Sequence, residues 1–87
     1  MEFMPESETE FIRIFRNAEL KIRTFDGCKS LSFFREIGPQ CVYFTISEWE
    51  TVGHLEAYRN SPLFSTTWNA TKALFSGPPR AWSLEKQ

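Results

Sequence analysis

Apolar side chains recur every three or four positions between residues 11 and 25, and this spacing predicts a helix with one buried face. The apolar stripe consists of Phe11, Phe15, Ala18, Ile22 and Phe25. Ahead of it, Ser7 and Glu10 have the spacing of a capping box, in which their side chains accept hydrogen bonds from backbone N–H groups of the first turn. The helix should end near Thr24, because Asp26-Gly27 favours a turn.

Two stretches after this helix alternate as strands do. Residues 28–36 and 41–49 flank Gly38-Pro39, and this arrangement predicts a hairpin. Both faces of the second strand carry apolar groups, whereas an antiparallel sheet with one face in water alternates more cleanly. A single layer of helices covers only one of these faces. The side chains that need a second cover are Val42, Phe44 and Ile46.

Two shorter helices are predicted after the hairpin. Thr51 is placed to cap a helix over residues 52–58, and Ser61, with Pro62 at the first helical position, begins another. Gly77-Pro78-Pro79 ends the second helix. Its apolar stripe consists of Phe64, Trp68, Thr71 and Phe75.

The two ends of the chain complete the predicted sheet. Phe3 and Met4 look like the tail of a first strand, and residues 80–84 predict a last one. The element order is then β-α-β-β-α-α-β. This order indicates an α+β, ferredoxin-like fold with a four-stranded antiparallel sheet.

Composition limits the classes of partner. A chain of 87 residues forms one domain over residues 1–87, and its net charge of −1 lacks the positive surface that non-specific nucleic-acid binding needs. No apolar run approaches the roughly 18 residues of a membrane span, so we expect a soluble cytoplasmic protein without membrane contact.

One histidine and no Cys-x-x-Cys motif leave a transition-metal site without ligands, and we expect no metal and no cofactor. Cys28 and Cys41 start consecutive strands, and we expect them to be reduced and near each other.

The chain resembles a known family at this point. FTISEWET, LEAYRNSPLF and PRAWSL are similar to the antibiotic biosynthesis monooxygenase (ABM) domain. The most specific parts are the strand that ends in Trp49, the step Tyr58-Arg59-x-Ser61 and the closing Ala81-Trp82-Ser83. The resemblance covers nearly the whole chain and implies a first strand that begins ahead of Met1. It also implies a homodimer in which two sheets stack face to face as a dimeric α+β barrel, so that the partner covers the candidate dimer interface of Val42, Phe44 and Ile46.

The resemblance further implies a ligand cavity inside each subunit, between the sheet and the helices. The candidate pocket residues are Tyr43, Thr45, Trp49, Tyr58, Phe64 and Trp68. Members of the family that oxidise aromatic polyketides have been linked to a tryptophan at the place of Trp49 and an asparagine near Thr45. In haem-degrading members an axial histidine occupies the place of Trp68. Indole cannot replace imidazole as an iron ligand, so haem degradation by that route is disfavoured.

The resemblance therefore implies a cofactor-independent monooxygenase that acts on a small aromatic or quinol-like substrate, with Tyr43 and Thr45 as candidate polar contacts. A non-catalytic dimer that binds a small apolar metabolite is the alternative, and an isomerase on the same scaffold is a third possibility. No catalytic residue is assigned. His54 is expected to face water on its short helix, while Arg35 and Arg59 either pair with carboxylates or hold an anionic substrate.

Overall fold

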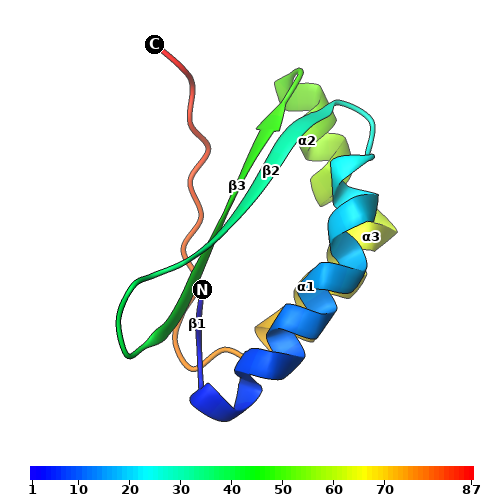
Figure 1. Ribbon diagram of the computed structural model, residues 1–87. Helices are drawn as coiled ribbons and strands as arrows, with labels where there is room; N and C mark the ends of the chain where they lie inside the picture. The colour runs from blue at the N-terminus through cyan, green and yellow to red at the C-terminus, as the bar shows by residue number, and fades with distance from the viewer.

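The computed structural model describes residues 1–87, and a sheet with helices on one side forms its framework (Figure 1). The strands β1 (Glu2–Phe3), β2 (Cys28–Arg35) and β3 (Cys41–Trp49) lie in the order β1-β3-β2, and both pairings are antiparallel. A 3₁₀ turn η1 (Pro5–Ser7) leads into the long helix α1 (Glu8–Arg23). The helices α2 (Val52–Arg59) and α3 (Pro62–Lys72) follow β3.

Helix α1 supplies half of the buried apolar core, as its apolar spacing predicts. Phe11, Phe15, Ala18 and Ile22 are buried, and Phe11 is the most enclosed large side chain at 1% exposure. The predicted capping box is wrong. Ser7 belongs to the 3₁₀ turn that Pro5 opens, with helical rather than extended backbone angles, and its side chain caps nothing. Glu10 instead forms an ion pair with Arg13.

The hairpin β2–β3 has the predicted bounds to within one residue. Leu31 pairs with Ser47, Phe33 with Thr45 and Arg35 with Tyr43, so these side chains share the face that α1 covers. The opposite face carries Phe34 beside Phe44, and Ile46. Phe44 is 46% exposed and Ile46 55% exposed, so the chain's own helices do not cover this face.

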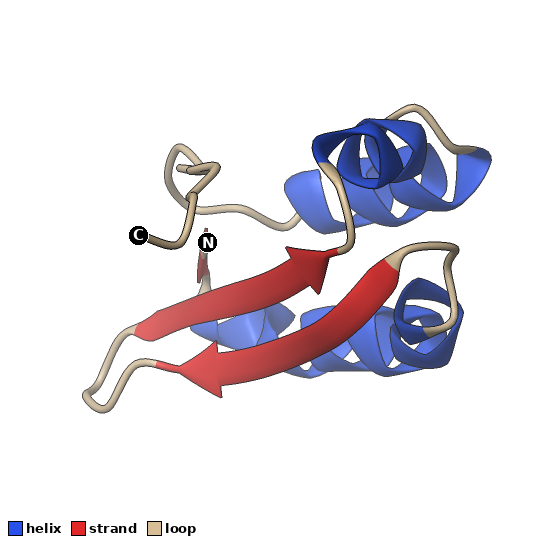
Figure 2. Cartoon of the chain, turned by 90° about the horizontal axis from the view of Figure 1, so that it is seen from above, coloured by secondary structure: helices blue, strands red, loops and turns tan.

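Both short helices start at the predicted caps. The Thr51 hydroxyl accepts a hydrogen bond from the backbone N–H of His54, and the Ser61 hydroxyl accepts one from Phe64. Helix α2 lies against β3, whereas α3 runs alongside α1. In Figure 2, α3 and α1 are the two long helices on the same side of the hairpin. This arrangement leaves the middle of β3 without a helix directly on it.

The predicted fourth strand over residues 80–84 is wrong. Residues 78–87 contain no helix or strand. Just before them, Phe75 forms an isolated antiparallel bridge with Phe3 of β1. Two physical reasons account for the missing strand. Pro78 and Pro79 have no N–H to donate, and β1 offers only two residues of edge, which Phe75 and Ser76 already use. The tail then runs past the sheet in an extended path (Figure 1).

Cys28 and Cys41 are free, but the expectation that they lie near each other is wrong. Cys28 pairs with Trp49 at one end of the sheet, and Cys41 pairs with Phe3 at the other. The starts of two antiparallel strands lie at opposite ends of a hairpin.

None of the helices has both the length and the apolar character that crossing a bilayer demands.

Candidate functional site

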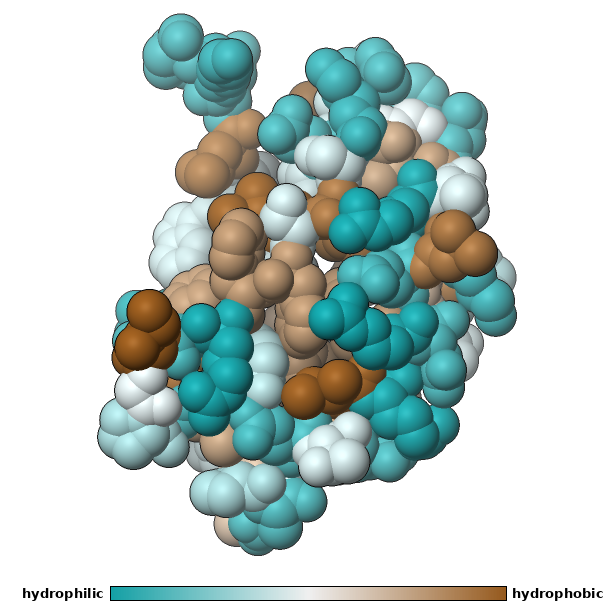
Figure 3. All heavy atoms as spheres, in the orientation of Figure 1, coloured by the Kyte–Doolittle hydropathy of each residue, from teal (hydrophilic) through white to brown (hydrophobic).

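A hollow of about 1830 Å³ extends along β3 between the sheet, the helices α2 and α3, and the C-terminal tail. It wraps around the free side of β3, so both faces of that strand line it. In Figure 3 apolar surface is visible between the tail and the helices, interrupted by polar side chains. Every candidate pocket residue lines this hollow: Tyr43, Thr45, Trp49, Tyr58, Phe64 and Trp68.

A continuous row of aromatic rings forms one wall of the hollow. Trp49 stacks on Tyr58 with ring centroids 5.0 Å apart, and the edge of Tyr58 meets Phe64 at 5.3 Å. Phe64 lies parallel to Trp68 at 6.0 Å, and Trp68 meets Phe75 at 5.5 Å. Offset-stacked and edge-on pairs of this kind are the favourable arrangements for aromatic rings. The row therefore gives the wall a fixed shape from Trp49 at the end of β3 to Trp68 on α3, and Phe75 continues the row beyond the lining of the hollow.

The floor of the hollow is more polar than its wall. Thr45 and Ser47 lie on the helix-facing side of β3 between Tyr43 and Trp49, yet both are exposed because no helix lies directly on them. The indole N–H of Trp49 donates to the Ser47 hydroxyl at 2.9 Å. The tryptophan N–H is thus occupied within the strand, whereas the hydroxyls of Thr45 and Ser47 both keep an O–H free to donate, because Ser47 is the acceptor of that bond.

Tyr58 offers a further free hydroxyl. Its ring is held between Trp49, Phe25 and Phe64, while its hydroxyl has no partner within the chain and reaches the surface of the hollow, since no unpaired side-chain oxygen is fully buried. Burial raises the pKa of the Tyr58 hydroxyl, so it is a neutral donor at neutral pH. The sequence places Tyr58 only as a pocket wall; the structure gives it a polar group as well.

Tyr43 contributes its ring but not a free hydroxyl. The ring stacks on Phe33 with centroids 5.3 Å apart, and the residue is 3% exposed. Its hydroxyl donates to Glu8, whose same carboxylate oxygen accepts a hydrogen bond from Nε of Arg35 at 2.7 Å. This bond occupies the group for which Tyr43 is a candidate polar contact.

The Glu8–Arg35–Tyr43 cluster joins the start of α1 to the ends of β2 and β3. The hydrogen bond from Tyr43, and then that from Arg35, lowers the pKa of the Glu8 carboxyl. Burial and the neighbouring carboxylate raise the pKa of Tyr43, and the bond to Glu8 raises that of Arg35. Of the two roles that the sequence allows for Arg35, pairing with a carboxylate or binding an anionic substrate, the structure shows the first. Arg35 lies outside the aromatic wall of the hollow.

His54 lies differently from the expectation that it faces water. Its Nδ1 is 2.8 Å from the Thr51 hydroxyl, and its Nε2 is 3.7 Å from a carboxylate oxygen of Asp26. The ring also lies against Gly27 and fills the space that a Cβ at this position would need. His54 thus fastens α2 to the turn between α1 and β2 and takes no part in the hollow.

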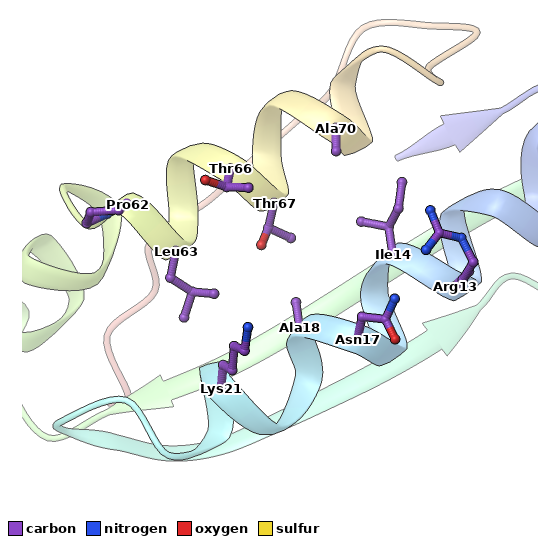
Figure 4. A pocket seen from close by; sticks show the side chains of 10 residues that line it. All are labelled: Arg13, Ile14, Asn17, Ala18, Lys21, Pro62, Leu63, Thr66, Thr67 and Ala70. Atoms are coloured by element: carbon purple, nitrogen blue, oxygen red, sulfur yellow. The ribbon is translucent and has the colours of Figure 1, made fainter.

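A separate groove of about 440 Å³ lies between α1 and α3 on the side away from the sheet (Figure 4). Ala18, Leu63 and Thr67 form its base, with Asn17 and Lys21 at its edge. It contains none of the residues that the sequence singles out for a site and no aromatic ring. It is an open depression between two packed helices.

Comparison with known proteins identifies the family to which the chain belongs. The profile of the family described as antibiotic biosynthesis monooxygenase matches residues 1–69. A candidate antibiotic biosynthesis monooxygenase of Bordetella bronchiseptica shares the fold with a TM-score of 0.83 and 23% identity, over 100% of this chain and 90% of that one. A conserved protein of Methanosarcina mazei gives a TM-score of 0.82 at 17% identity, over 88% of this chain and 76% of that one. Among the curated proteins, none matches the chain.

Proposed function

Because the chain belongs to the antibiotic biosynthesis monooxygenase family, we propose that it is a small cofactor-independent monooxygenase for an aromatic or quinol-like substrate. The observation that carries this proposal is the aromatic row from Trp49 to Trp68 along the hollow. A flat substrate ring gains both buried area and favourable ring–ring geometry against such a wall. The floor opposite this wall is more polar and carries the hydroxyls of Thr45 and Ser47.

The chemistry needs no second substrate besides oxygen. A hydroquinone reacts with O₂ to give a hydroxyquinone and one molecule of water. One oxygen atom enters the ring, the other leaves as water, and the substrate supplies all the electrons. The protein's part is to bind the phenolate form and to exclude water around it. The hydroxyls of Tyr58, Thr45 and Ser47 line the hollow, and in this proposal they donate to a phenolate oxygen.

The proposal includes a homodimer that is built on the uncovered sheet face. Phe44 and Ile46 are about half exposed there, and Phe34 lies beside them at 51% exposure. Such a contiguous apolar face favours association, because burying it removes apolar area from water. Ile46→Asp should convert the dimer to a 10.2 kDa monomer in sedimentation velocity at micromolar concentration. Val52→Asp, at a 71% exposed position on α2, is the matched control and should leave the dimer intact.

Oxygen uptake with a panel of hydroquinones and polycyclic phenols tests the activity. Tyr58→Phe keeps the ring in the row and removes only the hydroxyl, so kcat should fall by roughly 10- to 100-fold, as expected for one hydrogen bond to a charged oxygen. Trp49→Ala should abolish uptake by opening the wall. Leu20→Ala, at a 70% exposed position on α1, should not change the rate. No uptake with any compound of the panel would refute the oxygenase.

One observation favours a second candidate function, a non-catalytic binder. The hydroxyl of Tyr43 and the N–H of Trp49 are both occupied by partners within the chain. In that case a panel compound should raise the melting temperature of the protein without oxygen uptake. Stabilisation that depends on Trp49 but comes without turnover would support the binder over the enzyme.

A further inference from the structure

The indole of Trp49 is held in a fixed orientation at the end of β3. Its ring stacks on Tyr58 with ring centroids 5.0 Å apart, and it meets the ring of Phe25 edge-on at 6.1 Å. Contact with two rings of different orientation restricts the indole to one position. The aromatic packing therefore sets the direction of the Trp49 N–H before any ligand binds.

The acceptor of this N–H is the side chain two residues earlier on β3. The Trp49 N–H donates to Oγ of Ser47 at 2.9 Å. Residues i and i+2 of a strand lie on the same face, so the bond closes within β3 and needs no other element. A serine that accepts such a bond is held in the rotamer that directs its oxygen to the donor.

The same bond determines what Ser47 can offer to a ligand. A hydroxyl accepts at its lone pairs and donates a single O–H, so an Oγ that accepts from Trp49 directs its O–H away from the indole. The cross-strand neighbour of Ser47 is Leu31, which is buried and has no side-chain acceptor for this O–H. Ser47 is exposed and lines the hollow, so its O–H is available to a molecule bound there.

We propose that Trp49 is a positioning residue for Ser47, whose hydroxyl donates to the ionised oxygen of an aromatic ligand bound against the aromatic wall. This inference rests on the proposed function for the place of the ligand, but it requires no reaction with oxygen. The bond from the indole makes the Ser47 hydroxyl a stronger donor, because linked hydrogen bonds polarise one another. A donor that is oriented in advance also needs no reorganisation when a charged oxygen arrives.

This arrangement selects for the charge of the ligand oxygen. A hydroxyl bonds an anionic oxygen about twice as strongly as a neutral one, whereas contact between rings does not require ionisation. The hollow should therefore prefer a phenolate to the corresponding methyl ether. Thr45 and Tyr58 also carry hydroxyls in the hollow, but the Trp49 N–H donates to neither, so only the contribution of Ser47 should depend on Trp49.

Isothermal titration calorimetry of the full chain with 4-nitrophenol and 4-nitroanisole, at a pH at which the phenol is ionised, tests the proposal. The phenolate preference is the ratio of the two affinities, in which a general change of the wall cancels. Ser47→Ala should lower this preference about tenfold, as expected for one hydrogen bond to a charged group. Trp49→Phe keeps a ring in the wall and removes the N–H, so it should lower the preference roughly threefold.

A double-mutant cycle shows whether Trp49 acts through Ser47. Trp49→Phe should have no further effect on the phenolate preference in a Ser47→Ala background and should keep its full effect in a Thr45→Val background. Circular dichroism checks that the variants fold, and Ser47→Ala changes only an exposed position.

The proposal is overturned if the wild type shows no phenolate preference or if Ser47→Ala leaves the preference unchanged. It is also overturned if Trp49→Phe has the same effect with and without Ser47, since the indole N–H would then contact the ligand directly. A phenolate preference that depends on Ser47, without oxygen uptake from any quinol, would remove the oxygenase and support the present inference. Oxygen uptake with a preference that is independent of Ser47 would do the reverse.

Discussion

Gly27→Ala should destabilise the protein strongly, and the turn geometry explains why. Gly27 has a φ of +85°, a region in which an L-residue with a Cβ is strained by about 1 kcal/mol. An added Cβ would lie 2.2 Å from Cγ of His54, far inside the 3.4 Å of ordinary contact. Moving a packed ring aside costs about 1–3 kcal/mol. The total loss of unfolding free energy is therefore about 2–4 kcal/mol, which lowers the melting temperature of a domain of this size by roughly 10–25 °C.

A double-mutant cycle separates the two contributions to this loss. In a His54→Ala background the steric part disappears and only the backbone strain remains, so Gly27→Ala should cost about 1 kcal/mol there. Urea unfolding, followed by tryptophan fluorescence and by circular dichroism, gives the four free energies. The reasoning is refuted if Gly27→Ala alone costs less than about 0.5 kcal/mol, or if its cost is the same with and without His54.

Three further outcomes are expected. Phe11→Ala should lose about 3–5 kcal/mol of unfolding free energy in urea titrations, because Phe11 is 1% exposed, whereas Leu20→Ala, at 70% exposure, should stay within about 0.5 kcal/mol. Ser61→Ala should lose about 1 kcal/mol because its hydroxyl caps α3, while Ser7→Ala, which removes no capping bond, should be neutral in the same assay. Because the hydrogen bonds from Tyr43 and Arg35 lower the folded-state pKa of the Glu8 carboxyl below its ordinary value, the stability that Glu8 contributes is present above that ordinary pKa and is lost as the pH falls through the folded-state pKa. The melting temperature of Glu8→Gln should therefore fall less than that of the wild type between pH 6 and pH 3. Equal falls in the two proteins would contradict the hydrogen-bonded role of Glu8.

The elements that the sequence predicts correctly are those that local spacing determines. The stripe of α1 steps by three and four, and four of its five residues form the buried face, whereas Phe25 lies beyond the end of the helix and is half-buried. Thr51 and Ser61 cap their helices because an N-cap needs only the residue itself and the N–H three positions later. Ser7 has the same residue type and spacing but fails, because Pro5 draws it into a 3₁₀ turn with the wrong backbone angles.

The missing fourth strand depends on a contact that sequence pattern does not contain. Residues 80–84 alternate as a strand should, but a strand also needs a partner edge. That edge is β1, whose two residues are already bonded to the region of Phe75 and Ser76. Local propensity therefore predicts a strand where the available edge permits none.

The sequence predicts where the pocket residues lie, but not which of their polar groups are already hydrogen-bonded within the chain. Helix and strand periods place Trp49, Tyr58 and Phe64 near one another, and the structure stacks them in a row. The same periods do not predict that the Tyr43 hydroxyl donates a hydrogen bond to Glu8. This bond depends on Glu8, a residue 35 positions away on another element, and on the way in which α1 crosses the end of the sheet.

The placement of Cys28 and Cys41 at opposite ends of the sheet has a practical use. An intramolecular disulfide needs Cα atoms within about 7 Å, and a hairpin the length of β2 cannot bring its two starting residues that close. Cys41 is buried and Cys28 is only half-buried, so a maleimide dye reaches Cys28 first. A probe attached there is opposite Trp49 in the sheet, and its emission would report arrival of a guest molecule at that end of the aromatic row.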